Sequence, residues 1–120
     1  MCGFPCLNVA ARNCDDHTKN FSFRLKKDAK WELAPAYDVC HAWQPNHQWV
    51  SQHALSINGK RTNITKDDLL IIGKSINNKK ATEAIDEINA TVAQWKTYAD
   101  ETAVSPELRD KIARTLINLK

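Results

Sequence analysis

The fold is decided around residues 21–33, which read FSFRLKKDAKWEL. Apolar and polar residues alternate in FSFRL (21–25) and again in WEL (31–33), and a short polar stretch separates the two segments. Alternation with a period of two indicates strands with one apolar face, and the short connection predicts an antiparallel β-hairpin. Pro35 is expected to end the second strand, because proline cannot donate a ladder hydrogen bond.

Polar side chains that can carry chemistry gather on both sides of this hairpin. The segment before it, 12–20, reads as a loop and contains NCDDHTKN at 13–20, and LAPAYD at 33–38 follows the second strand. Asn20 enters the hairpin and Asp38 leaves it, so antiparallel pairing would bring both side chains to the same end, within reach of one ligand. Further upstream, residues 4–11 fit either the end of a helix or a buried strand, since Pro5 argues against a full helix from Met1.

The second half of the chain is typical of helices that follow a long loop. Residues 39–63 are irregular and rich in Trp and His, which predicts a long ordered loop. Thr65 is expected to cap a helix whose buried face is formed by residues 69–72. A second helix is expected over about 79–98, and a third is expected to begin at Ser105. The apolar stripes expected to be buried are Ala81, Ala84, Ile85, Ile88, Val92 and Trp95 in the second helix and Leu108, Ile112, Leu116 and Leu119 in the third.

These patterns predict an α+β fold: a single partial domain spanning residues 1–120, with a short hairpin, a long loop and about three packed helices. The chain is 42% hydrophobic and 26% charged, and its longest candidate apolar run, residues 69–72, is far too short to cross a membrane. The net charge is +3 and basic residues occur in pairs, so direct DNA binding is not expected. No basic and apolar leader is visible, and the expected compartment is the cytoplasm.

The expected compartment also bears on the state of the four cysteines. They stand at positions 2, 6, 14 and 40, and no two have zinc-knuckle spacing. In the cytoplasm they are expected to stay reduced and to pack as small apolar residues.

Asp15, Asn20 and Asp38 form a combination that suits phosphoryl transfer. This reaction needs magnesium to neutralise phosphate charge, oxygen ligands to hold the metal, and a carboxylate to orient the attacking hydroxyl. Protein kinases use an aspartate base, an asparagine five residues later, and a second aspartate beyond a short hairpin. Asp15 and Asn20 have that spacing, and Asp38 lies beyond the hairpin. The competing interpretation is an Asx-rich loop whose side chains cap local backbone groups.

The whole pattern resembles the HipA family, the kinase toxins of bacterial toxin–antitoxin pairs. The resemblance rests on DDHTKNFSF at 15–23 and LAPAYDV at 33–39. It begins near Asn8, continues through SQH at 51–53 and SINGKR at 56–61, and covers nearly the whole chain. It implies the mostly helical C-terminal lobe of a protein-kinase-like fold, in which the hairpin carries the active-site loop. The glycine that follows the second aspartate in many protein kinases is absent, because Val39 stands there.

The resemblance implies a role for each residue of the motif. Asp15 would be the catalytic base toward a serine or threonine hydroxyl of a protein substrate, and Asn20 and Asp38 would hold Mg²⁺ together with ATP. His17 is assigned a loop-orienting role and Lys19 a phosphate contact. For the loop residues Gln52, His53, Asn58 and Lys60, both a substrate-contacting and a structural role stay open.

The resemblance also implies a part that these 120 residues lack. A kinase covers ATP with a glycine-rich loop and a strand lysine, whereas the three glycines here lie far apart, at positions 3, 59 and 73. The first hypothesis is therefore a catalytic segment that is inactive alone and works when another chain supplies the ATP-binding lobe. The second is a degenerate, non-catalytic fragment that binds an antitoxin or associates with itself through exposed core residues.

Two further alternatives use other residue sets. A magnesium-dependent hydrolase would use Asp15, Asp16, His17 and Asp38. A transition-metal site would use Cys40, His41, His47 and His53, although their spacing fits no zinc motif.

Overall fold

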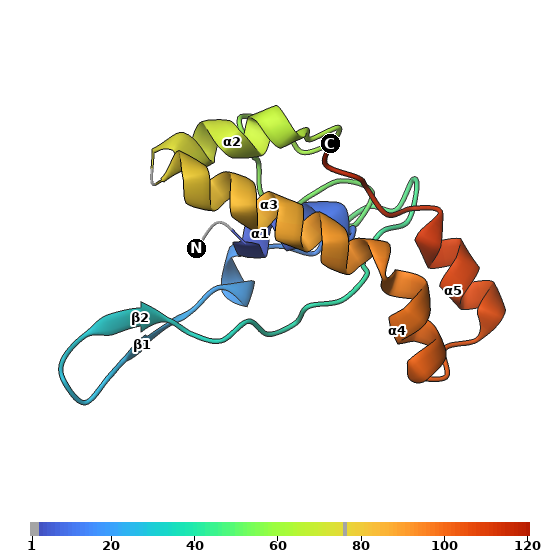
Figure 1. Ribbon diagram of the computed structural model, residues 1–120, viewed down its shortest axis with the longest axis horizontal. Coiled ribbons are helices and arrows are strands. Elements are labelled where there is room, and N and C mark those ends of the chain that lie inside the picture. The colour runs from blue at the N-terminus through green and yellow to red at the C-terminus, as the bar shows by residue number, and fades with distance from the viewer. Residues whose placement is uncertain (1–2, 76) are drawn as a thin grey trace.

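The computed structural model describes residues 3–75 and 77–120, which form five helices, one 3₁₀ turn and one two-stranded hairpin (Figure 1). In chain order these are α1 (Gly3–Ala10), η1 (Thr18–Asn20), β1 (Phe23–Leu25), β2 (Trp31–Leu33), α2 (Lys66–Lys74), α3 (Asn78–Ala93), α4 (Trp95–Glu101) and α5 (Pro106–Ala113). The α+β class is confirmed, but after the long loop the described residues form four helices, α2 to α5, where about three were expected. None of the described helices is long and apolar enough to cross a membrane.

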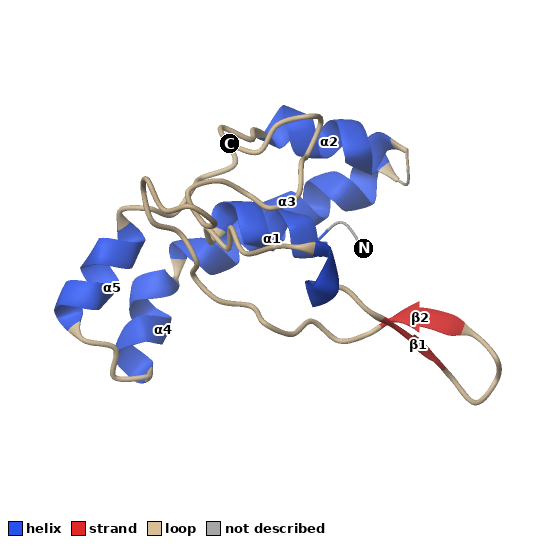
Figure 2. Ribbon diagram, turned by 180° about the vertical axis from the view of Figure 1, so that it is seen from behind, coloured by secondary structure: helices blue, strands red, loops and turns tan. Residues whose placement is uncertain are grey.

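Residues 4–11, for which helix and strand were both open, lie mostly in α1. Pro5 falls in its first turn, where a backbone N–H has no partner within the helix, so proline costs little there. The helix packs against α3, and α2 also packs against α3 (Figure 2). The core between these helices consists of Cys6, Val9, Ala10, Ile57, Ile64, Leu69, Ile85 and Leu119.

Helix α2 begins where the sequence predicts. The Thr65 hydroxyl accepts a hydrogen bond from the Asp68 backbone, and the Asp68 carboxylate accepts one from the Thr65 backbone, which completes a capping box. The expectation that residues 69–72 are all buried is wrong: Leu69 is buried, whereas Ile71 and Ile72 are exposed. A helix turns about 100° per residue, so four consecutive side chains cannot share one face.

The single helix expected over 79–98 is wrong, because the chain forms two helices that meet at Gln94. Helix α3 ends at Ala93, and α4 begins at Trp95 and packs against α5. The Trp95 indole N–H donates to the Arg109 carbonyl at 2.9 Å, a contact between α4 and α5. Of the expected stripe, Ala81 and Ile85 are buried and the remaining residues are only partly buried.

Helix α5 begins as predicted, with Ser105 as its cap, but it ends at Ala113. The expected stripe is therefore wrong: Leu108 is exposed, and Leu119 lies beyond the helix in an irregular C-terminal segment. That segment returns to the core. The Ile117 N–H donates to the Ala10 carbonyl at 2.9 Å, and Leu119 is buried in the same cluster as Ile85 of α3.

The hairpin forms in the predicted place and extends away from the helices (Figure 1). Its register pairs Phe23 with Leu33, Arg24 with Glu32, and Leu25 with Trp31. The two apolar pairs share one face of the hairpin, and all four of these side chains are exposed. Residues 39–63 form the expected long loop, with only isolated bridges in it.

Candidate functional site

The loop before β1 is fixed by main-chain contacts on both sides. Asn13 N–H donates to the Asn8 carbonyl at 2.8 Å, and Cys14 N–H donates to the Ala42 carbonyl at 2.9 Å. These bonds hold the loop that carries Asp15 against α1 and against the segment that follows Asp38.

Asp15, Asn20 and Asp38 are connected through main-chain groups at the base of the hairpin. The Asn20 side-chain amide donates to the Asp15 carbonyl at 2.9 Å. The Tyr37 hydroxyl donates to the Lys19 carbonyl at 2.6 Å, which joins the segments that enter and leave the hairpin. The buried Asn13 amide donates to the Asp38 carbonyl at 3.3 Å. The antiparallel geometry therefore brings Asn20 and Asp38 to the same end of the hairpin, with Asp15 beside them.

Cys40 lies two residues after Asp38, and its thiol has a perturbed pKa. Burial raises the pKa of Cys40, and the negative charges of Asp38 and Asp15 raise that pKa further. Asp38 has a φ of 54°, a left-handed conformation that is uncommon outside glycine and is often found at functional sites.

His17 and Lys19, the other motif residues, lie at the rim of this region. His17 Nε2 is 3.8 Å from Asp15 Oδ1, and its Nδ1 is buried without a hydrogen-bond partner in the described part of the chain. Lys19 is exposed and contributes its carbonyl to the Tyr37 contact.

Asn20 and Asp38 carry the oxygen donors that a hard cation such as Mg²⁺ prefers. Asn20 is buried and uses its Nδ2 on the Asp15 carbonyl, so its amide oxygen is the donor atom that remains for a cation, while Asp38 is exposed. One carboxylate and one amide oxygen are a typical protein share of a magnesium shell that phosphates and waters complete. The buried Asn13 Oδ1 has no partner among the described residues, and such an acceptor beside Asp38 suits a metal-bound water.

The alternative transition-metal site is not assembled. His41 Nε2 lies 2.8 Å from Thr115 Oγ1, and His47 Nδ1 accepts the Trp49 backbone N–H at 3.1 Å. Within residues 3–75 and 77–120, no three His, Cys, Asp or Glu side chains are grouped so that they could hold a metal ion.

The sequence interpretation missed a buried ion pair between Asp16 and His53. Asp16 Oδ2 lies 3.0 Å from His53 Nδ1, and the two side chains are only 5% and 4% exposed. Burial lowers the pKa of His53, but hydrogen bonds to Asp16 and Cys14 and their negative charges outweigh it and raise the pKa to about 9. A signal for this pair was present in the sequence: Asp15 and Asp16 are adjacent, and the phosphotransfer interpretation assigns a role only to Asp15, which leaves Asp16 for a structural contact.

Asn58 and Lys60, whose role was open, make structural contacts. Asn58 Nδ2 donates to Asp68 at 2.8 Å, and Lys60 Nζ lies 2.9 Å from the same carboxylate. Hydrogen bonds from Asn58, the Thr65 backbone and Lys60 hold the pKa of Asp68 well below its usual range. These contacts fasten the long loop to the beginning of α2.

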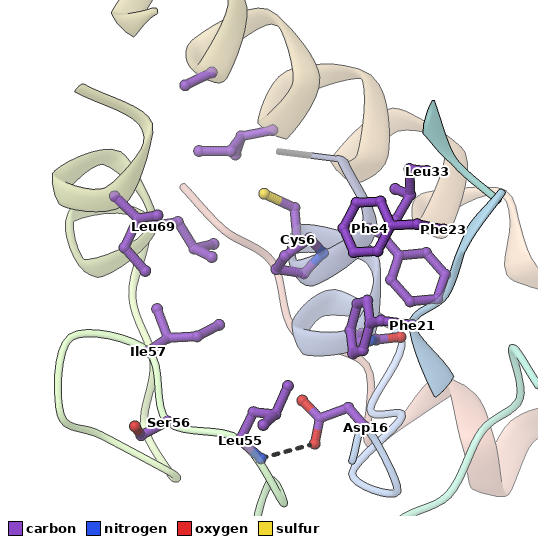
Figure 3. Close-up of a pocket in the computed structure, with 15 residues that line it drawn as sticks. Phe4, Cys6, Asp16, Phe21, Phe23, Leu33, Leu55, Ser56, Ile57 and Leu69 are labelled. Carbon is purple, nitrogen blue, oxygen red and sulfur yellow. Dashed lines mark hydrogen bonds between the residues drawn. The ribbon is translucent and has the colours of Figure 1, made fainter. Parts of the chain in front are cut away.

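A cavity of about 310 Å³ lies beside the candidate site (Figure 3). Phe4, Cys6, Phe21, Phe23 and Leu33 line it near α1 and the hairpin, and Leu55, Ile57 and Leu69 line the opposite wall. The rings of Phe4 and Phe21 meet edge to face at 5.0 Å. The cavity is mainly apolar and continues onto the exposed apolar face of the hairpin.

Comparison with known proteins gives one match. A family model described as the HipA-like C-terminal domain matches residues 3–95, a range that includes Asp15, Asn20 and Asp38. No curated protein and no solved structure matches the chain. Since the family model covers more than half of the sequence, the chain belongs to the HipA-like C-terminal domain family.

Proposed function

We propose that this chain carries the catalytic-base and magnesium-binding part of a serine/threonine kinase site of the HipA-like toxin family. The observation that supports the proposal is that hydrogen bonds from Asn20 to the Asp15 carbonyl and from Tyr37 to the Lys19 carbonyl join the segments that carry Asp15, Asn20 and Asp38 at the base of the hairpin. Family membership supports it, because the matched range contains all three residues. We expect the protein to work in the cytoplasm, where ATP and protein substrates are both available.

Each residue has a distinct task in this proposal. Asp15, whose side chain is about half exposed, accepts the proton of a substrate serine or threonine hydroxyl. Asn20 and Asp38 hold Mg²⁺ on the phosphates of ATP, and the metal supplies neutralisation of phosphate charge when it is bound. His17 lies beside Asp15 and orients it, while the exposed Lys19 meets a phosphate oxygen.

The first test measures magnesium-dependent nucleotide binding to the 120-residue chain by NMR titration. We expect weak ATP binding that requires Mg²⁺ and that is lost in Asp38→Asn, because this change removes the only carboxylate of the proposed metal site. Asp28→Asn is the matched control, since Asp28 is an exposed acid at the hairpin tip that pairs with Lys30. Binding that ignores magnesium, or equal binding by wild type and Asp38→Asn, would contradict the proposal.

A second candidate function, a protein-binding module, is favoured by the apolar face of the hairpin. Phe23, Leu25, Trp31 and Leu33 expose large side chains on one face, and an isolated two-stranded hairpin is only marginally stable in water. A partner such as an antitoxin, or a second copy of the chain, would cover this face.

Self-association gives the direct test of this second function. In sedimentation velocity we expect the mass of the wild-type chain to rise with concentration, and Trp31→Lys to reduce that rise. Trp49→Lys is the control, because Trp49 is 69% exposed and Trp31 is 68% exposed, yet Trp49 lies in the long loop. Equal effects of the two substitutions would argue against a hairpin interface.

A further inference from the structure

The Asp16 carboxylate joins two loops that lie far apart in the sequence. Its Oδ2 accepts from His53 Nδ1 at 3.0 Å, and its Oδ1 accepts from the backbone N–H groups of Ala54 at 2.7 Å and Leu55 at 3.4 Å. Figure 3 shows this carboxylate at the edge of the cavity, directed toward the backbone at Leu55. One buried side chain therefore fastens the loop before β1 to the segment 53–55.

The receiving loop is itself held in place. His53 N–H donates to the Arg61 carbonyl at 2.9 Å, and the Arg61 guanidinium donates back to the His53 carbonyl at 2.6 Å. The charged and titratable groups that face His53 are Asp16 and Cys14 from the loop before β1 and Arg61 from its own loop. His53 is thus held in place by Arg61, and the hydrogen bond to His53 in turn holds Asp16.

Asp16 also fixes its neighbours in the chain. Asp16 is buried, while the preceding Asp15 exposes about half of its side chain. The carbonyl of Asp15 also accepts a hydrogen bond from the Asn20 side-chain amide. Movement of Asp16 out of its pocket would therefore displace both Asp15 and Asn20.

We propose that the Asp16–His53 ion pair is a positioning device that holds the Asp15–Asn20 loop in the arrangement needed for phosphotransfer. Asp16 and His53 touch neither substrate nor metal, and they act through the loop that Asp16 anchors. The inference rests on the proposed function for the roles of Asp15 and Asn20, whereas the anchoring itself is a statement about loop geometry.

The test observes the side-chain carboxamide carbon of Asn20 by NMR in the 120-residue chain, first without metal. In Asp16→Asn we expect this resonance to move toward its unfolded position, while that of Asn89, whose side chain is bonded to Leu119, stays in place. Asp86→Asn is the control, because Asp86 forms an exposed ion pair with Lys66. An unchanged Asn20 resonance in Asp16→Asn would overturn the inference.

Adding Mn²⁺ then separates the inference from the proposed function. We expect millimolar Mn²⁺ with ATP to broaden the Asn20 resonance in wild type and in Asp86→Asn, and to broaden it much less in Asp16→Asn. If wild type is not broadened, the proposed function fails, and the metal-free shift still decides whether the pair holds the loop. Equal broadening in wild type and Asp16→Asn would reject the positioning role.

A second variant tests the pair should Asp16→Asn fail to fold. His53→Asn keeps an N–H donor near the place of Nδ1 but removes the titration. We expect the wild-type Asn20 resonance to move as the pH rises through about 9, where His53 loses its proton, and the resonance of His53→Asn to stay level. A level wild-type profile, or the same movement in His53→Asn, would refute the proposal.

Discussion

Two adjacent aspartates lie in different environments in the loop before β1. Asp15 exposes its carboxylate beside Asn20 and Asp38, whereas Asp16 is buried against His53 and the backbone of the long loop. A buried carboxylate without a partner would be costly, so the pairing with His53 is what makes this arrangement stable. The hydrolase alternative, which needs Asp16 in the reacting group, is less compatible with a carboxylate that is already fully engaged.

The His53 pair gives a stability that depends on pH. The folded-state pKa of about 9 lies above the ordinary value of 6.5, so the stabilisation is complete below pH 6.5 and is lost as the pH rises through about 9. We expect the free energy of unfolding in urea to fall by about 3 kcal/mol between pH 6.5 and pH 9.5 from this group. His47→Gln should keep this profile, because His47 is exposed and lies outside the pair. A wild-type profile as flat as that of His53→Asn would show that the pair does not stabilise the fold.

At the scale of the elements, α2 and α3 meet at a glycine. A Cβ added at Gly73 would overlap the methyl carbon of Ala81, and both positions are buried between the two helices. The missing side chain is therefore what allows the helices to approach each other at this point.

We expect Gly73→Ala to destabilise the chain by about 2 kcal/mol, because the two helices must move apart. Thermal unfolding followed by circular dichroism measures this loss. The double variant Gly73→Ala with Ala81→Gly is the control, since it moves the methyl group from one helix to the other and should recover part of the stability. A single variant as stable as wild type would mean that the helices separate at no cost.

The break between α3 and α4 at Gln94 also depends on contacts between elements. The apolar repeat continues smoothly from Ile85 through Val92 to Trp95, and that repeat predicts one helix. The periodicity says which face is apolar, but it does not say which element the face contacts. Trp95 binds the Arg109 carbonyl, a partner in α5 that no local pattern reveals.

At the scale of the whole molecule, the C-terminal segment closes the core. Asn89 in α3 brackets Leu119, donating from Nδ2 to its carbonyl at 2.7 Å and accepting from its N–H at 2.9 Å. Leu119 then fills the core beside Val9 and Ile85. The last residues thus connect α1 with α3.

We expect Leu119→Ala to cost about 3 kcal/mol, since it removes a fully buried leucine and leaves a cavity. Leu108→Ala is the matched control, because Leu108 is exposed on α5 and its truncation should change stability little. Urea unfolding of the two variants compares them directly. Equal losses would show that the C-terminal segment does not pack as described.

The sequence by itself determined the local features of this protein. The hairpin and the Thr65 and Ser105 caps depend on residues within a few positions of one another, and each was predicted at the place where it forms. Short separations make such features readable, because backbone geometry alone relates the residues involved.

Only the tertiary structure decided the contacts between distant segments. The Asp16–His53 pair spans 37 residues, and the Asn89–Leu119 bracket spans 30. Periodicity marks an apolar or polar face without naming its partner, and a long irregular loop gives no pattern that fixes where it returns. The two aspartates at 15 and 16 are chemically identical in the sequence, and only the fold distinguishes them, because it buries Asp16 and leaves Asp15 about half exposed.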